Sequence, residues 1–285
     1  MLELKSSRWA RDIIGLQNED GNWGYFHTLS NPTKQNPLTT EQALRRLQIL
    51  GYTLEDDPIK KAVNYLHDCL SGKAQIPDRR EKLHNWDIFT SIMFSAWIRR
   101  FTLTDSLANE TAEKWAEIVS SSFIEGTYNH DYYTKAYTKT FKLLPRGGRL
   151  VDFVSFYQVS LLNGVLDGEI EQAVFDYFLC HEAGIYYIYE GRLSELPEDF
   201  RSKRANRYIS ALELLSEYEN VTCRKKLKFA AEWLYQNREQ DGRWDMGTYV
   251  KDFVHFPLSD SWRSSESRKC DCTYRISKLL ERIGS

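Results

Sequence analysis

The chain has 285 residues, of which 42% are hydrophobic and 14% aromatic, and its formal net charge is −2. This length suffices for one large domain with a sizeable core, and the near-neutral charge excludes a general nucleic-acid binder. Five cysteines without small-domain spacing, an N-terminus without a secretion-signal pattern and the lack of an apolar run of ~18 residues together predict a cytoplasmic protein with no transmembrane segment.

Amphipathic patterns predict one set of five helices, which we call the outer helices. In chain order they span about residues 4–16, 58–70, 107–124, 168–181 and 221–236. In the second of them, apolar residues from Ile59 to Leu70 recur at i, i+3, i+4 and i+7, and Pro58 fits the first helical turn. Because each helix has one apolar and one polar face, we expect the polar face to meet water.

A second set of five helices alternates with the first, and we call these the inner helices. They span about residues 39–50, 85–101, 150–166, 204–218 and 271–283. The second and third contain the stretches WDIFTSIMFSAWI and LVDFVSFYQVSLL, which are apolar nearly all round. A helix of that composition is buried, so we expect the outer helices to surround the inner ones.

The alternation repeats about every 50–60 residues, which is the size of a helix-pair repeat. We expect five such pairs to stack side by side and close into a ring within one domain, residues 1–285. Connections from inner to outer helices are short, whereas those from outer to inner helices are long. Long connections are often functional, so we expect the mouth of a site where they meet.

Two related stretches, QNEDGNW at 17–23 and NREQDGRW at 237–244, each follow an outer helix and open a long connection. Asp-Gly favours a tight turn with positive φ. The Trp ring can fold back on the helix end, and the Gln amide can bond the exposed peptide groups there. The motif therefore indicates a structural link between one helix pair and the next rather than a catalytic group.

These stretches resemble the QW repeat of the terpenoid cyclase and protein prenyltransferase superfamily, also known as the prenyltransferase and squalene oxidase repeat. The stretch LTTEQALRRLQILGY, followed by DDPIKKAVNYL, resembles the helix pair that follows such a motif. The resemblance implies an all-α fold, the α/α toroid. It also implies a terpenoid cyclase-like or prenyltransferase-like protein that binds an isoprenoid or another apolar ligand in a central cavity, with a partner protein if it follows the prenyltransferases.

The catalytic motifs of that superfamily carry over only in part. The DxDD motif of the cyclases and the DDxxD motif that binds magnesium diphosphate are both missing. Prenyltransferases place an Asp-x-Cys pair at the start of an inner helix as zinc ligands. By this resemblance Cys270 and Cys272, at the predicted start of the last inner helix, are candidate zinc ligands. The alternative is that Asp271 caps the helix and the two cysteines pack in the core.

Acidic residues recur near the starts of the inner helices. Asp87, Asp152 and Asp271 are the candidate catalytic residues, because a ring would bring them together at the mouth, where two carboxylates can act as acid and base. Asp87 and Asp152 are the stronger candidates, since each belongs to a very apolar helix. The alternative is plain capping, because acidic residues favour helix N-termini through the dipole.

Aromatic and basic residues complete the predicted site. Trp86, Tyr187 and Trp262 are candidates to line an apolar cavity, as rings of this kind steady carbocations in cyclases. Arg201 and Arg204 are candidates to hold a diphosphate or carboxylate beside a helix N-terminus. The alternatives are core packing for the rings and solvated loop charge for the arginines.

Two other functions stay open at this point. A non-catalytic binding or scaffold protein would keep the toroid without the chemistry, in agreement with the missing motifs. A carbohydrate-active α/α-toroid enzyme would use paired carboxylates, although the cysteine usage and the N-terminus argue against secretion. A deep apolar cavity containing a buried carboxylate would favour the cyclase-like function over both.

Overall fold

The computed structural model describes residues 4–27, 30, 34, 37–82, 84–147 and 152–284. The protein is all-α, with 52% of it helical. A two-residue antiparallel hairpin of β1 (Phe123–Ile124) and β2 (Thr127–Tyr128) interrupts the helices. Within the described part of the chain, none of the helices is long and apolar enough to cross a bilayer.

The outer helices form where the amphipathic patterns predict them. They are α1 (Arg8–Ile14), α3 (Asp57–Leu70), α5 (Ser106–Ser120), α8 (Gly168–Cys180) and the pair α10 (Val221–Lys225) and α11 (Lys228–Gln236), which share the range predicted for the fifth. A short 3-10 turn, η1 (Leu4–Ser6), precedes α1. The predicted range 107–124 is too long at its end, because the chain turns after Ser121 and enters β1.

The inner helices are α2 (Thr40–Ile49), α4 (Trp86–Arg99), α7 (Phe156–Leu162), α9 (Lys203–Leu215) and α12 (Ser265–Ile283). Two of them differ in length from the prediction. The range 150–166 shrinks to α7, because Ser155 is extended and pairs with Tyr186 in a parallel bridge, while residues 150–151 lie outside the described residues. Conversely, α12 begins six residues early, because the Ser264 side chain accepts the Ser267 amide and caps the helix there.

One helix, α6 (His130–Phe141), lies in a stretch that the sequence analysis assigned to a long connection. Its apolar face consists of Tyr133, Tyr137 and Phe141, which recur every four residues. This face packs on α5, where the Trp115 ring lies 6.0 Å from the ring of Tyr137 and 5.8 Å from that of Phe141. The aromatic stripe explains why so polar a segment forms a helix.

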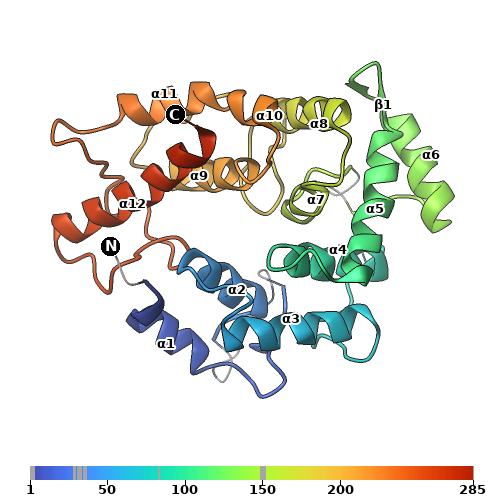
Figure 1. The fold of residues 1–285 in the computed structure, drawn as a ribbon, viewed down its shortest axis with the longest axis horizontal. Helices are drawn as coiled ribbons and strands as arrows, with labels where there is room; N and C mark the ends of the chain where they lie inside the picture. Colours follow the sequence, from blue (N-terminus) through green and yellow to red (C-terminus); the bar gives the residue numbers. More distant parts are fainter. Residues whose placement is uncertain are drawn as a thin grey trace.

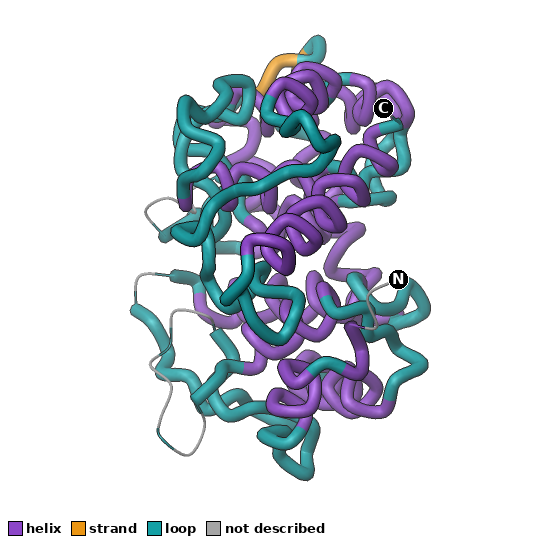
Figure 2. The backbone as a smooth tube through the Cα atoms, turned by 90° about the vertical axis from the view of Figure 1, so that its left-hand side faces the viewer, coloured by secondary structure: helices purple, strands orange, loops and turns teal. Residues whose placement is uncertain are grey.

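In Figure 1, α2, α4, α7 and α9 lie around the middle of the view, and α1, α3, α5, α8 and α11 lie farther out. The helix α12 runs from the left-hand edge of the view toward the middle. Much of the described loop backbone lies along the left-hand side of Figure 2. The segments between an outer helix and the inner helix that directly follows it are longer than those from an inner helix to the next outer helix, as predicted. As predicted from its composition, α7 is a buried helix, since every one of its residues is buried; in α4 the buried residues run mainly from Phe89 to Ile98, and its first turn is more open.

The first and last segments of the chain contact each other. The Trp9 indole donates to the Ser259 carbonyl at 3.0 Å, and the Arg8 backbone N–H donates to Asp260 at 3.1 Å. These contacts join residues that are about 250 positions apart in sequence. They bring α1 against the long connection that precedes α12.

Arg46 of α2 makes a second contact of this kind from the core. Its side chain is only 3% exposed and donates to the carbonyls of Val254, at 2.8 Å, and Pro257. Burial lowers the pKa of Arg46 to about 10, although the charges of Asp252 and Asp271 oppose the shift. The guanidinium thus holds the last long connection against the first inner helix.

The two Trp-containing turns confirm the structural interpretation of the repeated motif. Each Trp indole donates at 2.7 Å to a carbonyl ten residues earlier, near the end of the preceding outer helix: Trp23 to Ile13 and Trp244 to Leu234. Each Trp backbone N–H donates to a threonine hydroxyl of the next inner helix, Thr40 or Thr273. The motif therefore fastens each outer helix to its inner partner.

The polar residue that opens each turn differs between the two copies. In the first, the Gln17 amide donates at 2.8 Å to the carbonyl of Gly21 and at 2.8 Å to that of Pro58, at the start of α3. In the second, Arg238 takes this place and donates to Gly242 at 2.5 Å. The motif was predicted to link one helix pair to the next. The Gln17 contact with Pro58 confirms this for the first copy, whereas the Arg238 bond of the second copy stays within its own turn.

Candidate functional site

The structure places two of the predicted catalytic aspartates in separate networks. Asp87, in the first turn of α4, has 80% of its side chain exposed and pairs with Arg80 at 3.0 Å. Asp152 lies before α7 and pairs with His181 at 2.7 Å, with about 15% of each side chain exposed. Burial alone would lower the pKa of His181, but the Asp152 carboxylate outweighs it and the pKa is raised.

The third aspartate, Asp271, is an anchor for the preceding connection. Its carboxylate is buried in α12 and accepts hydrogen bonds from the backbone of Leu258 and Ser259 and from the Trp262 indole, at 2.8, 2.9 and 2.6 Å. Trp262 is therefore core and not an open cavity wall. The three aspartates thus have separate sets of partners, and their convergence at one mouth stays a prediction.

The predicted pairing of Cys270 and Cys272 at a helix start is wrong. Because α12 begins at Ser265, both cysteines lie inside the helix, where positions two apart face different sides. Cys270 is exposed, whereas Cys272 is buried, and burial raises the pKa of its thiol to about 12. Across the described residues, no group of three or more His, Cys, Asp or Glu side chains forms a metal cluster.

The remaining predicted ligand-binding residues are dispersed. Trp86 lines a surface hollow at the start of α4, and Tyr187 packs its ring 5.3 Å from that of Tyr157. Arg201 pairs with Glu239 at 3.0 Å, and Arg204 donates to the Tyr189 hydroxyl at 3.2 Å. Both arginines thus contact residues of the long connections, and the 61% exposure of the Arg201 side chain agrees with the alternative of solvated loop charge.

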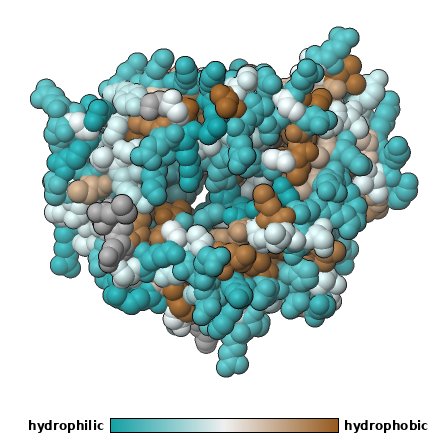
Figure 3. Space-filling model, in the orientation of Figure 1, coloured by the Kyte–Doolittle hydropathy of each residue, from teal (hydrophilic) through white to brown (hydrophobic). Residues whose placement is uncertain are grey.

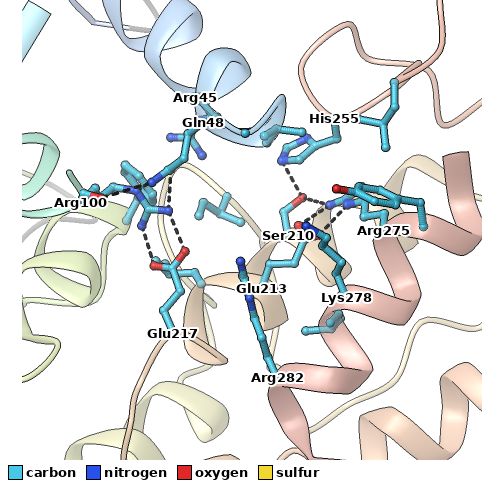
Figure 4. A pocket seen from close by; sticks show the side chains of 18 of the residues that line it. Arg45, Gln48, Arg100, Ser210, Glu213, Glu217, His255, Arg275, Lys278 and Arg282 are labelled. Atoms are coloured by element: carbon cyan, nitrogen blue, oxygen red, sulfur yellow. Dashed lines mark hydrogen bonds and ion pairs between the residues drawn. The ribbon is translucent and has the colours of Figure 1, made fainter. Parts of the chain in front are cut away.

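A cavity of about 320 Å³ lies between the inner helices (Figure 4), and the face seen in Figure 3 is hollowed near its centre. Its polar wall comes from the C-terminal halves of α2, α9 and α12 and from the end of α4. Exposed residues such as Gly51 and Lys278 mark its open side, next to the short connections. The long connections supply its floor through Ile188, His255 and Leu258. The cavity thus opens at the opposite end from the predicted mouth.

Both glutamates of the cavity wall are neutralised by arginines. Glu213 of α9 receives two hydrogen bonds from Arg275 of α12, at 2.7 and 2.6 Å. Glu217 receives two from Arg100, at 2.8 and 2.7 Å. Burial would raise the pKa of Glu213, but the Arg275 guanidinium outweighs it and the pKa is lowered. Such bidentate pairs are strong and geometrically fixed.

Two further cations in the wall have no such partner. Lys278 and Arg282 lie one turn apart on α12 and are directed into the cavity (Figure 4). Among the described residues, neither has a carboxylate within the 4.0 Å of an ion pair. The nearest recorded neighbour of the Lys278 ammonium is the Tyr274 ring, at 4.8 Å. Within the described part of the chain, the open side of the cavity therefore carries two cations without an ion-pair partner, although the Arg282 charge also acts on Glu213 at longer range.

The aromatic wall opposite these cations is also covered by positive charge. The Arg45 guanidinium lies 4.1 Å from the Phe156 ring and 5.7 Å from the Trp97 ring. Arg100 lies 5.4 and 5.7 Å from the same two rings. Since the π faces of these rings already hold guanidinium groups, they are not open to a carbocation.

A chain of three polar groups runs along the floor. The His255 ring nitrogen Nε2 lies 3.1 Å from the Ser210 hydroxyl, and its Nδ1 lies 2.9 Å from an Asp252 carboxylate oxygen. Arg275 donates a further hydrogen bond to the Ser210 hydroxyl at 2.9 Å. Ser210 and His255 both line the cavity, so this chain faces the space that a ligand would fill.

Comparisons with family models, with curated proteins and with solved structures find no match to this chain. The resemblance to the terpenoid cyclase and prenyltransferase superfamily therefore stays a prediction from the motif copies. The geometry of the cavity is the ground on which a function can be argued.

The residues of the cavity wall are not among the predicted site residues, although the sequence contains one signal for them. Arg275, Lys278 and Arg282 recur at i, i+3 and i+7 in a helix predicted to be inner, where basic residues are unexpected. A basic stripe on such a helix predicts a charged centre. By contrast, Ser210, Glu213 and His255 come together only through tertiary packing.

Proposed function

We propose that the chain is an α/α toroid whose central cavity binds a small organic anion with an apolar part. The alternation of inner and outer helices around one centre supports the ring, as do the contacts of Trp9 with Ser259 and of Arg46 with Val254. A volume of about 320 Å³ falls within the usual range for small-molecule sites, roughly 300–1,000 Å³.

The observation that carries the proposal is the charge balance of the wall. Five basic side chains line the cavity against two carboxylates, and both carboxylates are engaged by arginines. Arg45 has its own partner in the buried Glu41, 3.1 Å away. Lys278 and Arg282 are left to attract a ligand, and charge-assisted hydrogen bonds to a carboxylate or phosphate are the strong ones.

The apolar part of the ligand has its own wall. Ile188 and Leu258 belong to the floor, and Leu214 and Leu279 line the α9 and α12 side. These side chains contribute apolar surface that does not depend on the Trp97 and Phe156 rings, whose faces hold guanidinium groups. An amphiphilic anion satisfies both walls at once, whereas a neutral isoprenoid leaves the cations unpaired and pays their desolvation.

This proposal narrows the functions considered from the sequence. An isoprenoid that carries a diphosphate or carboxylate belongs to the proposed ligand class, but carbocation cyclisation is disfavoured because guanidinium groups occupy the aromatic faces. A carbohydrate-active enzyme is disfavoured because Glu213 and Glu217 are locked to arginines and are not free for acid–base catalysis. A binding protein on the toroid fits best.

The test is calorimetric titration with matched ligand pairs, octanoate against octanol and farnesyl diphosphate against farnesol. We expect the anion of at least one pair to bind at least tenfold more tightly. Lys278→Gln combined with Arg282→Gln should weaken that binding by about tenfold or more, since one charged hydrogen bond contributes roughly 1.5–3 kcal/mol. Lys60→Gln combined with Lys228→Gln, at exposed positions outside the cavity, serves as the control. Equal affinity for anion and alcohol would refute the proposal.

A further inference from the structure

The three-group chain on the cavity floor has the connectivity of a nucleophile, a base and an orienting carboxylate. Ser210 belongs to α9, and Asp252 and His255 to the connection before α12, so tertiary folding brings them together. The two distances, 3.1 Å from hydroxyl to imidazole and 2.9 Å from imidazole to carboxylate, lie within hydrogen-bond reach. We propose that Ser210, His255 and Asp252 form a hydrolytic triad acting on esters bound in the cavity.

Asp252 is fixed as an ionised acceptor. Its Oδ1 accepts the backbone N–H groups of Val254, His255 and Phe256 at 3.1, 2.8 and 3.0 Å. Its Oδ2 is left for the imidazole and for the Asn206 amide, at 2.9 and 3.0 Å. Burial would raise the pKa of Asp252, but these hydrogen bonds outweigh it and hold the pKa well below its usual range.

His255 is thereby set up as a base toward the serine. The anionic Asp252 carboxylate accepts a hydrogen bond from the Nδ1–H group and so keeps the proton on Nδ1. Nε2 is then the unprotonated nitrogen, and it faces Ser210 as an acceptor. Burial, followed by the nearby Arg275 charge, lowers the pKa of His255 below its ordinary value, against the opposing effects of Asp252 and Glu213. The lowered pKa favours the neutral ring, which is the form that a general base needs.

Ser210 has more polar partners than a helical serine needs. Serine in a helix commonly donates to the carbonyl four residues earlier, and the Asn206 carbonyl, 2.9 Å from the Ser210 oxygen, is the alternative acceptor to His255 for the single hydroxyl proton. Two partners from other segments, the His255 imidazole and the Arg275 guanidinium, also reach its oxygen. Donation from Arg275 favours the developing alkoxide, so the surroundings lower the barrier to removing the hydroxyl proton.

The reaction balances with water as the co-reactant. The Ser210 oxygen attacks the ester carbonyl while its proton passes to His255 Nε2. The bond from the carbonyl carbon to the alcohol oxygen breaks, and the alcohol leaves with that proton. Water then attacks the acyl-serine, again with His255 as base, and the carboxylic acid departs as Ser210 recovers its proton. Asp252 is a positioning residue throughout.

The substrate class rests on the proposed anion-binding function. Lys278, one turn beyond Arg275 on α12, and Arg282 hold a negative group toward the open side, while Ser210 meets the ester at the floor. We therefore expect an ester that carries a carboxylate or phosphate at its far end. The reactivity of Ser210 itself does not depend on that group, so the two ideas can be tested separately.

The experiment uses the full chain and two substrates of equal length, 4-nitrophenyl hydrogen suberate and 4-nitrophenyl octanoate, together with a fluorophosphonate probe. We expect the probe to label Ser210, as located by peptide mass spectrometry. Ser210→Ala should lower kcat/KM by at least about 100-fold. Ser160→Ala is the matched control, because Ser160 has the same 8% exposure and also bonds an arginine, Arg100, but no histidine.

The outcomes separate the triad from the cavity. Asp252→Asn should lower kcat and alter the pH profile, whereas a merely structural role would leave the profile of the folded variant unchanged. Absence of label at Ser210, or hydrolysis that survives Ser210→Ala, would overturn the triad even if anion binding by calorimetry is intact. Equal kcat/KM for suberate and octanoate, with Ser210 labelled, would support the triad and overturn the anionic substrate class.

Discussion

Replacing the glycine of each Trp-containing turn by alanine tests how the two turns differ. Gly21 has φ +97° and Gly242 has φ +82°, a region that costs an alanine about 1–2 kcal/mol. At Gly21 an added Cβ would lie 2.5 Å from the Lys61 carbonyl oxygen of α3 and 2.6 Å from its carbon. At Gly242 it would meet only the flexible end of the Arg238 side chain, at 3.1 Å.

The expected loss in unfolding free energy follows from these contacts. Gly242→Ala carries the backbone strain alone, about 1–2 kcal/mol. Gly21→Ala adds displacement of the α3 backbone, about 1–3 kcal/mol as for other overpacked sites, giving about 2–5 kcal/mol in total. Urea denaturation followed by circular dichroism measures both variants in parallel. Losses of unfolding free energy that agree within ~0.5 kcal/mol would refute this difference between the turns, in which Gly21 lies against the α3 backbone and Gly242 against the Arg238 side chain.

Three further predictions concern other parts of the molecule. Cys270 should react with iodoacetamide in the native protein at least tenfold faster than Cys272, whose thiol is buried with its pKa raised to about 12; peptide mass spectrometry of timed samples measures both, and equal rates would contradict the assignment. Asp152→Asn should destabilise the protein more at pH 6 than at pH 9. Below the ordinary histidine pKa of about 6.5, the raised pKa of His181 stabilises the folded state, and this stabilisation is lost as the pH rises through the raised pKa. Denaturation of both proteins at the two pH values measures the difference. Arg46→Ala should cost about 2–4 kcal/mol, since one buried and one partly buried carbonyl lose their donor, and an unchanged midpoint in urea would show that this contact is dispensable.

The helices could be predicted because their signal is local. In α3 the apolar positions follow a single stripe, and in α4 the apolar run is long enough to exclude a strand. The errors come from segments where another interaction decides. The stretch before α7 is as apolar as the helix that follows it, but Ser155 there is extended and forms a bridge with Tyr186. The helix α6 was not predicted because it is polar except for the aromatic stripe that packs against Trp115.

The site could not be predicted for a different reason. The lengths of the connections predicted at which end of the inner helices a ligand binds. In the structure, the long connections fill that end with side chains and form the floor of the cavity. His255 illustrates this, since it lies in a predicted mouth connection and yet reaches inward to Ser210. The prediction for Asp271 was affected in a similar way. Its place near a predicted helix start suggested that it faces the mouth, whereas its buried carboxylate binds the backbone of Leu258 in the preceding connection.

The polarity of the inner helices changes around the cavity, and this bears on the kind of ligand. On one side, α4 and α7 present the aromatic rings of Trp97 and Phe156, and both helices are apolar nearly all round. On the other, α9 and α12 present Ser210 and the unpaired Lys278. A cavity meant only to shelter a hydrocarbon would gain nothing from this division, because the bound hydrocarbon would cover exposed cations without pairing them and so cost solvation free energy. The division is useful only if one end of the bound molecule is charged and the other is not.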